Sequence, residues 1–361
     1  TAAVFTQNAF RAAPVTVAER NNAAQDARYL LINSGNANAG TGQPGMMACE
    51  QTCVDVARLT ESDVRRVLPF STGVIGEVLD PAKLAAALPS AIANLDEGNW
   101  ERAARAIMTT DTRPKMRTHS VEVGGRSCCL TGMSKGSGMI QPNMATMLGF
   151  IATDAVIPAS ILDGMLRTAV NLSFNRITVD GDTSTNDAVT LSATGQSDFV
   201  VSPTAPEEAL AFQAALNELA IALAQDIIRD GEGATKFVEI EVLDARSVDE
   251  ADRVARTIAH SPLVKTALFA SDPNWGRILA AVGRAGVEDL DVDTVSLSLN
   301  GVLIAEKGAR AQNYTERAGV AAMAPEDLLI SVNLARGNQA ATIWTTDFSY
   351  DYVKINAEYR T

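Results

Sequence analysis

One threonine lies where a loop meets an apolar run, and its hydroxyl is the first candidate for chemistry. Thr146 belongs to the stretch "KGSGMIQPNMATMLGF", residues 135–150, in which glycines and Pro142 predict a loop. The apolar residues after Thr146 predict a buried strand. A threonine hydroxyl is a weak nucleophile and needs a base within hydrogen-bonding reach. The two histidines, His119 and His260, have no evident task, and no G-x-S-x-G nucleophile elbow occurs.

The α-amino group of the threonine itself is another base, with an ordinary pKa of about 7.7–8.0. That amine is free only if the peptide bond between Ala145 and Thr146 has been broken. Attack of the Thr146 hydroxyl on the carbonyl of Ala145 would give an ester that water can open, and the small Ala145 leaves room for it. The sequence therefore permits self-cleavage at this bond. The alternative is that Thr146 simply begins a strand, since threonine favours strands.

The composition narrows the classes of function. The 361 residues carry a net charge of −13 and contain no lysine or arginine cluster, so a binder of nucleic-acid phosphates is not expected. An acidic surface suits solubility, or small cationic and zwitterionic ligands. No apolar run approaches the roughly 18 residues of a membrane helix. The start, "TAAVFTQNAF", resembles neither a signal nor a transit peptide and is already strand-like, as if a leader were missing.

The residues that could bind metals or form disulfides do not make a recognisable site. Cys49 and Cys53 are four apart on an expected helix, and Cys128 and Cys129 are adjacent, so no disulfide framework is predicted and a reducing cytoplasm is expected. The loop "DGDTSTND", residues 180–187, lacks the glycine and final glutamate of a calcium loop. "GEGATK" lacks the Walker spacing. We expect no metal and no tightly bound cofactor.

Strands and helices alternate along the chain, which predicts an α+β or layered α/β fold with helices outside mixed sheets. A change in composition near residue 236 predicts two domains, 1–235 and 236–361. The expected strands lie within 28–40, 67–76, 119–133, 147–152, 176–195, 236–244, 294–307 and 328–337, and the expected helices within 46–59, 82–95, 158–174 and 207–230.

Short local signals predict where these elements begin and turn. Gly124–Gly125 and Asn300–Gly301 predict hairpin turns. Ser71–Thr72–Gly73 predicts an interruption of its strand. Helix starts are predicted at Thr60–Asp63, at Asp80–Pro81, at Thr204 with Glu207, at Ser247 with Glu250 and at Asp272–Pro273.

Several segments together resemble one known family. "KGSGMIQPNMATMLGFIATDA" is similar to the autoprocessing segment of the bifunctional ornithine acetyltransferases of arginine biosynthesis, also called glutamate N-acetyltransferases. "VFTQNAFRAAPV", "INSGNANAGTG", "STGVIGE", "IMTTDT", "NRITVDGDTSTND", "SDPNWGRILAAVGRAG" and "YDYVKINAEYRT" resemble the same family in its usual order. The resemblance covers nearly the whole chain; the family's leader before "VFTQN" is the one part without a counterpart.

The resemblance implies roles for individual residues. Thr146 would be the nucleophile, exposed by cleavage after Ala145 into an α chain, 1–145, and a β chain, 146–361. Thr72 and Gly73 would stabilise the oxyanion. The residues that would bind substrate, besides Thr146, are Thr109, Lys135, Glu232, Asn356 and Thr361.

The resemblance also implies a fold and a reaction. The fold would be a layered α/β sandwich of the N-terminal-nucleophile kind, of αββα type over 1–235, with a smaller α/β domain whose C-terminal tail completes the site. The reaction would be ping-pong transfer of acetyl from N2-acetyl-L-ornithine to L-glutamate through acetyl-threonine. The α and β chains would pair as a heterotetramer, and acetyl-CoA is left open as a further donor.

Two alternatives stay open. A self-processing aminopeptidase or amidohydrolase on a similar scaffold would share the nucleophile and use water as the acceptor. An acidic α/β binding protein without catalysis would show no acetyl exchange.

Overall fold

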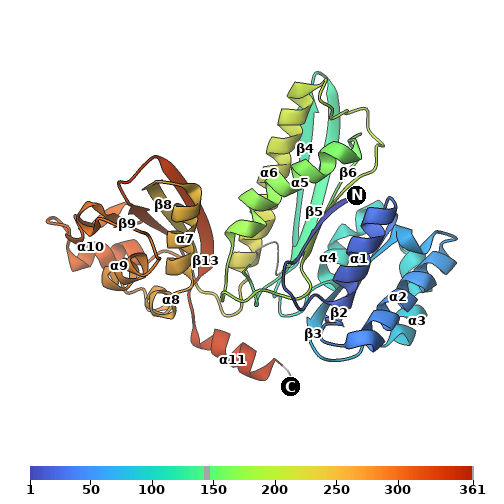
Figure 1. Cartoon of the computed structure of the whole chain (residues 1–361), viewed down its shortest axis with the longest axis horizontal. Coiled ribbons are helices and arrows are strands. Elements are labelled where there is room, and N and C mark those ends of the chain that lie inside the picture. The colour runs from blue at the N-terminus through green and yellow to red at the C-terminus, as the bar shows by residue number, and fades with distance from the viewer. Residues whose placement is uncertain (142–146, 360–361) are drawn as a thin grey trace. The chain divides into compact units, whose positions relative to one another are not determined.

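The computed structural model describes residues 1–141 and 147–359 and separates into two compact units. Unit 1 consists of Thr1–Asn175 with Asp182–Ile227, and unit 2 of Arg176–Gly181 with Ile228–Thr361 (Figure 1). The change between them at Ile227 lies ten residues before the first strand of unit 2, Phe237–Ala245. The short segment Arg176–Gly181 belongs to unit 2 although its neighbours in sequence belong to unit 1.

Unit 1 is built on a five-stranded sheet. Its inner strands are buried because their side chains face protein on both sides, and β6 (Leu148–Thr153) is almost entirely buried, as predicted for the residues after Thr146. Strands β6 and β7 are parallel, and the other pairs are antiparallel. The order across the sheet is β1 (Ala2–Phe5), β7 (Ala188–Ala193), β6 (Leu148–Thr153), β5 (Arg126–Lys135) and β4 (Lys115–Val123).

A second, two-stranded parallel sheet covers one face of this sheet. Phe70 meets Phe150 edge to face, with ring centroids 5.0 Å apart, and Leu68 and Met133 belong to the same buried cluster. The outer side of the pair packs against helices through Val17, Cys53 and their neighbours. The elements are β2 (Tyr29–Asn36), β3 (Val67–Val74), α1 (Ala13–Ala24), α2 (Gly42–Leu59), α3 (Pro81–Ala93) and α4 (Trp100–Ala106).

The opposite face of the five-stranded sheet carries α5 (Ala159–Leu172) and α6 (Pro206–Arg229) (Figure 1). A side chain at Gly132 of β5 would lie 2.9 Å from Leu219 and Leu223 of α6, so the glycine lets this helix approach the strand closely. Unit 1 is therefore layered helix, sheet, sheet, helix. The predicted α+β class with layered sheets and outer helices is confirmed.

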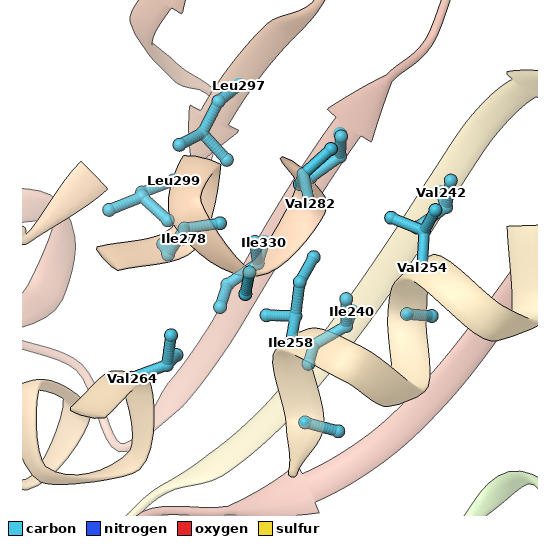
Figure 2. Close-up of a cluster of buried hydrophobic side chains, with 14 of the residues drawn as sticks. Ile240, Val242, Val254, Ile258, Val264, Ile278, Val282, Leu297, Leu299 and Ile330 are labelled. Carbon is cyan, nitrogen blue, oxygen red and sulfur yellow. The ribbon is translucent and has the colours of Figure 1, made fainter. Parts of the chain in front are cut away.

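Unit 2 is a mixed six-stranded sheet whose buried face carries helices. Ile240, Ile330 and Leu299 point toward Ile258 of α7 (Val248–Ala259) and Ile278 of α9 (Trp275–Gly283) (Figure 2). The strands are, in order, β11 (Ala309–Arg310), β10 (Val302–Glu306), β9 (Ser296–Leu299), β12 (Asp327–Asn333), β8 (Phe237–Ala245) and β13 (Gln339–Thr346). The helices are α7 (Val248–Ala259), α8 (Pro262–Phe269), α9 (Trp275–Gly283), α10 (Glu316–Met323) and α11 (Tyr350–Glu358). Among the helices that the structure describes, none is long and apolar enough to cross a membrane.

Several local signals form the predicted elements. Gly124–Gly125 joins β4 to β5, and both glycines have the positive φ that a two-residue hairpin turn requires. Asn300–Gly301 joins β9 to β10 in the same way. Asp80 accepts a hydrogen bond from the N–H of Ala82 at the start of α3, and Ser247 accepts one from Glu250 at the start of α7.

Four local predictions are wrong. Thr60 closes α2 instead of opening a helix, and Asp63 caps only the short 3-10 turn Val64–Arg66. Asp272–Pro273 precedes the true cap, Asn274, whose side chain accepts from the N–H of Arg277.

The expected strand near residue 176 is reduced to a single bridge between Ile177 and Trp344. Strand β3 is not interrupted at Ser71–Thr72–Gly73 but runs through to Val74, because the parallel strand β2 pairs with it there.

The close approach of β2 explains why glycine occupies position 73. Gly73 has φ +129°, and a β-carbon there would lie 2.2 Å from the carbonyl carbon of Gly35. Gly35, its partner in the register, also has a positive φ of +94°. Only glycine fits this backbone conformation without strain. The strand can therefore carry Thr72 and Gly73 to the end of the pair.

We predict that Gly73→Ala destabilises the protein by about 2–5 kcal/mol, because it combines a strained φ with a backbone clash. Gly164→Ala is the matched control: Gly164 lies in α5, and a β-carbon added there would have nothing within 4 Å. That change should stabilise the helix by about 0.5–1 kcal/mol. Urea unfolding followed by circular dichroism measures both; equal midpoints for the two variants would contradict the prediction.

Candidate active site

Three of the predicted site residues meet at the end of β5. The ammonium of Lys135, the last residue of the strand, lies 3.1 Å from Oγ1 of Thr72 and 2.8 Å from Oγ1 of Thr109. An ammonium has only hydrogens to donate, so both hydroxyl oxygens accept. Thr72 comes from β3, and Thr109 from the connection between α4 and β4. The lysine side chain is only 10% exposed.

A buried carboxylate supports this group from behind. Oδ1 of Asp111 accepts hydrogen bonds from the N–H of Gly136, at 2.8 Å, and from the ammonium of Lys115, at 2.5 Å. Oδ2 accepts from the N–H of Thr109 at 3.0 Å and lies 3.9 Å from the ammonium of Lys135. The side chain of Asp111 is wholly buried, and that of Lys115 is 1% exposed.

The ionisation of Asp111 is decided by competition between burial and its neighbours. Burial alone would raise the pKa of this carboxyl, because it removes the charged form from water. The charges of Lys135 and Lys115, with the hydrogen bond from Gly136, outweigh that effect and hold the pKa of Asp111 below its ordinary value. The group is therefore an anion between two cations at neutral pH.

The register of the sheet links this cluster to the seam around residue 146. Lys135 pairs with Leu148, the first residue of β6, so its ammonium lies at the end of the sheet where β6 begins. Leu148 follows Thr146 by two residues in the sequence. Ala145, Thr146 and the terminal Thr361 lie outside the described residues.

Polar contacts fix the end of the β2–β3 pair. Ser71 donates to Oδ1 of Asn33, and Nδ2 of Asn186 donates to the carbonyls of Ala37, at 2.6 Å, and Ser71, at 2.9 Å. Asn186 belongs to the loop with a calcium-like pattern, and this amide contact gives the loop a structural role. Among the described residues, no cluster of histidine, cysteine, aspartate and glutamate could hold a metal ion.

Unit 2 contains the predicted residues Glu232 and Asn356. Nδ2 of Asn356, on α11, donates to Oε2 of Glu232 at 2.7 Å, and Glu232 is only 7% exposed. Gly233 has φ +65°, and a β-carbon there would lie 2.4 Å from the N of Tyr352, so only glycine lets the loop meet the start of α11. Ser349, the cap of α11, also donates to the carbonyl of Gly233 at 2.6 Å.

The loop that carries Glu232 is anchored at its other end by Asp347. This buried carboxylate accepts from the N–H and hydroxyl of Thr235, at 2.8 and 2.7 Å, and from the N–H of Lys236, at 2.9 Å. The ammonium of Lys236 donates to the carbonyls of Met323, Ala324 and Pro325 at the end of α10. It therefore has the structural role of a helix C-cap.

The histidines and the cysteine pair have structural surroundings. Nε2 of His260 lies 3.1 Å from the hydroxyl of Thr178. Burial, with the nearby Arg256 and Lys265, lowers the pKa of His260 to about 4. His119 lies within β4 and is 3.9 Å from Glu218. Cys49 and Cys53 are free and buried on α2, and the hydrogen bond with Cys53, together with burial, raises the pKa of Cys49.

Sequence reasoning found the residues that meet at Lys135 but missed the group that holds them. Asp111 and Lys115 were not singled out, although Asp111 lies within the segment "IMTTDT". An aspartate two residues after a threonine looks like an ordinary turn or cap residue. Only the folded chain shows that its two oxygens face donors from three different segments.

Known proteins are similar to this sequence over its whole length. The sequence matches the ArgJ family over residues 1–361. It is 56% identical over 360 residues to the arginine biosynthesis bifunctional protein ArgJ of Methylococcus capsulatus, covering 100% of this chain and 88% of that protein. The protein of the same name from Pseudomonas fluorescens is 55% identical over 362 residues, covering 100% and 89%.

A solved structure of a protein with the same name agrees with this assignment. The crystal structure of arginine biosynthesis bifunctional protein ArgJ from Bacillus halodurans aligns with a TM-score of 0.55 and 42% identity over 59% of this chain and 99% of that one. An ornithine acetyltransferase from Mycobacterium tuberculosis, complexed with ornithine, aligns with a TM-score of 0.35 and 32% identity over 41% and 77%. The family resemblance of the sequence is thus confirmed. The chain belongs to the ArgJ family and is an acyltransferase of arginine biosynthesis.

Proposed function

We propose that this enzyme moves the acetyl group of N2-acetyl-L-ornithine to L-glutamate through an acetyl ester on Thr146. The observation that carries the proposal is the meeting of Thr72, Thr109 and Lys135 at the end of β5, opposite the first residue of β6. Family membership supports an acyl transfer, and the register supports a nucleophile just before β6.

The reaction begins with self-cleavage between Ala145 and Thr146, which frees the amine of Thr146 as a base. The length of the Bacillus halodurans chain supports this step. Nearly the whole of that chain aligns, and it covers only 59% of this one. Residues 146–361 make up about the same share of this chain. The α and β chains remain associated, and we extend the proposal to their pairing as a heterotetramer.

The first half-reaction forms the acetyl ester. The amine of Thr146 takes the hydroxyl proton, and the oxygen attacks the acetyl carbonyl. Because Oγ1 of Thr72 accepts from Lys135, the hydrogen of its own hydroxyl points away from that ammonium and can donate to the oxyanion, beside the N–H of Gly73. The tetrahedral intermediate then expels ornithine, whose amine receives the proton from Thr146.

The second half-reaction reverses these steps with another amine. The α-amino group of glutamate attacks the ester, and N-acetylglutamate leaves as the Thr146 oxygen regains its proton. Thr109 and Lys135 bind substrate in unit 1. In unit 2, the buried carboxylate of Glu232, held by Asn356, suits the cationic side-chain amine of ornithine. The cycle as written needs no metal, and acetyl-CoA is a second donor to test in the same assay.

The first prediction concerns self-cleavage. Thr146→Ala should leave one chain of 38.1 kDa, because the variant has no hydroxyl to attack Ala145. Thr146→Ser should still give two chains, because serine keeps the hydroxyl. Denaturing gels and intact mass measure both. Two chains from Thr146→Ala, or one from the native protein, would reject the cleavage step.

The second prediction concerns the acyl-enzyme. Native enzyme mixed with labelled N2-acetylornithine should gain one acetyl group on the first residue of the 146–361 chain, located by peptide mass. Added glutamate should speed the release of ornithine, because it removes the acetyl group from Thr146. If no adduct forms, the covalent step is refuted. If the adduct forms but added glutamate does not change the rate of ornithine release, the hydrolase alternative is favoured.

The third prediction concerns Glu232. Glu232→Gln should raise the KM for N2-acetylornithine about 10–100-fold, because a hydrogen bond to a charged group contributes about 1.5–3 kcal/mol. Glu326→Gln, an exposed carboxylate of the same unit, is the matched control and should leave the KM unchanged. Steady-state kinetics with thermal unfolding separates binding from stability. Equal KM values for the two variants would remove Glu232 from the site.

A further inference from the structure

We propose that Asp111 is a positioning residue that fixes Lys135 and Thr109 in the geometry needed for substrate binding. This inference rests on the proposed function, because Lys135 and Thr109 are its substrate-binding residues. Asp111 itself is buried behind them and acts through them.

Both oxygens of Asp111 hold parts of the binding group. Oδ2 accepts from the N–H of Thr109 and lies 3.9 Å from the ammonium of Lys135. Oδ1 accepts from the N–H of Gly136, the residue that follows Lys135. The Lys135 ammonium lies 2.8 Å from the Thr109 hydroxyl. The carboxylate therefore binds the backbone of both segments that make this contact, at Thr109 and next to Lys135. Loss of these bonds frees both residues at once.

If Asp111 served only to neutralise Lys115, its second oxygen would not need to contact Thr109 and Lys135. Lys115 needs one carboxylate oxygen, and it binds Oδ1 at 2.5 Å. The second oxygen faces Thr109 and Lys135, which Lys115 does not need. A structural role and a positioning role therefore predict different results when Lys115 is removed.

An amide cannot replace this carboxylate without conflict. Asparagine has one acceptor oxygen and one amino group with two donor hydrogens. In either orientation, the amino group would face N–H or ammonium donors, because donors lie on both sides of Asp111. Asp111→Asn keeps the size of the side chain but makes the contacts of one of its two terminal atoms repulsive.

The experiment compares Asp111→Asn, Lys115→Met and the double variant. Asp111→Asn should raise the KM for N2-acetylornithine about tenfold or more, since small displacements of binding groups have large effects. The double variant no longer buries an uncompensated Lys115, so it can be studied even if Asp111→Asn fails to fold. Its KM should stay at least about fivefold above that of Lys115→Met, because Lys135 and Thr109 remain unanchored. A KM equal to that of Lys115→Met would overturn the proposal.

A crystal structure of the double variant gives a readout that does not depend on activity. The distance from the Lys135 ammonium to Oγ1 of Thr109 should lengthen from 2.8 Å or the two groups should separate. An unchanged distance would overturn the positioning role even if the enzyme were inactive. Failure of the native enzyme to transfer acetyl groups would instead refute the proposed function and leave this structural result to decide on Asp111.

A matched control tests the removal of charge alone. Asp226 pairs with Arg117 of β4 at 2.6 Å, within the same unit. Asp226→Asn should leave the KM for N2-acetylornithine within about twofold of native, because the pair of Asp226 with the 45% exposed Arg117 includes none of the proposed substrate-binding residues. An equal rise in KM for Asp226→Asn and Asp111→Asn would show a general effect of charge and contradict a specific role for Asp111.

Discussion

Two ammonium groups and one carboxylate are buried together at the end of β5, and the arrangement of unit 1 around them follows from the cost of burying charge. An unpaired ion in a protein interior loses hydration worth several kcal/mol, and this loss must be offset by close partners. Asp111 can serve Lys115 and Lys135 together only if the connection after α4 lies against the end of the β4–β5 hairpin. That requirement helps to fix the position of Thr109, together with the burial of Ile107 in the cluster that contains Met133 of β5.

The β2–β3 pair supplies Thr72, the other hydroxyl that contacts Lys135. Its two strands approach so closely at Gly73 that a β-carbon there would clash with Gly35, and the positive φ of Gly35 favours glycine at that position too. Asn186, two residues before β7, then donates to the carbonyls of Ala37 and Ser71. Since the backbone is held at these points, the hydroxyl of Thr72 is presented to Lys135 by a rigid strand end, as a preorganised oxyanion donor would have to be.

The sequence alone predicts the local parts of this site better than their assembly. The hairpin turn at Gly124–Gly125 and the buried strand after Thr146 depend on neighbouring residues, and both form as expected. The interruption predicted at Gly73 fails because a glycine with positive φ usually marks a turn, whereas here a neighbouring strand demands it. Asp111 was missed because its partners lie up to 25 residues away in the sequence. The periodic spacing of apolar residues predicts helices and strands but not contacts between distant polar side chains. The roles of Thr72, Thr109 and Lys135 came from family resemblance.

The buried lysines differ in what holds them, and the difference bears on function. Lys236 binds three main-chain carbonyls at the end of α10. Lys265 binds the carbonyl of Thr346, the hydroxyl of Thr345 and the ring of Phe348, and burial lowers its pKa to about 7 although Asp347 and Asp180 oppose this. These partners belong to the fold and cannot leave without disturbing it.

Lys135 is held differently. Its ammonium contacts two side-chain hydroxyls, at 3.1 and 2.8 Å, and the carboxylate of Asp111 at 3.9 Å. Hydroxyl groups rotate, so a ligand oxygen can replace one of these hydroxyl contacts at little cost to the backbone. Lys135 is paired with Asp111 yet retains contacts that can be exchanged. A buried lysine with that combination is suited to bind a substrate, whereas Lys236 and Lys265 are suited to hold the fold.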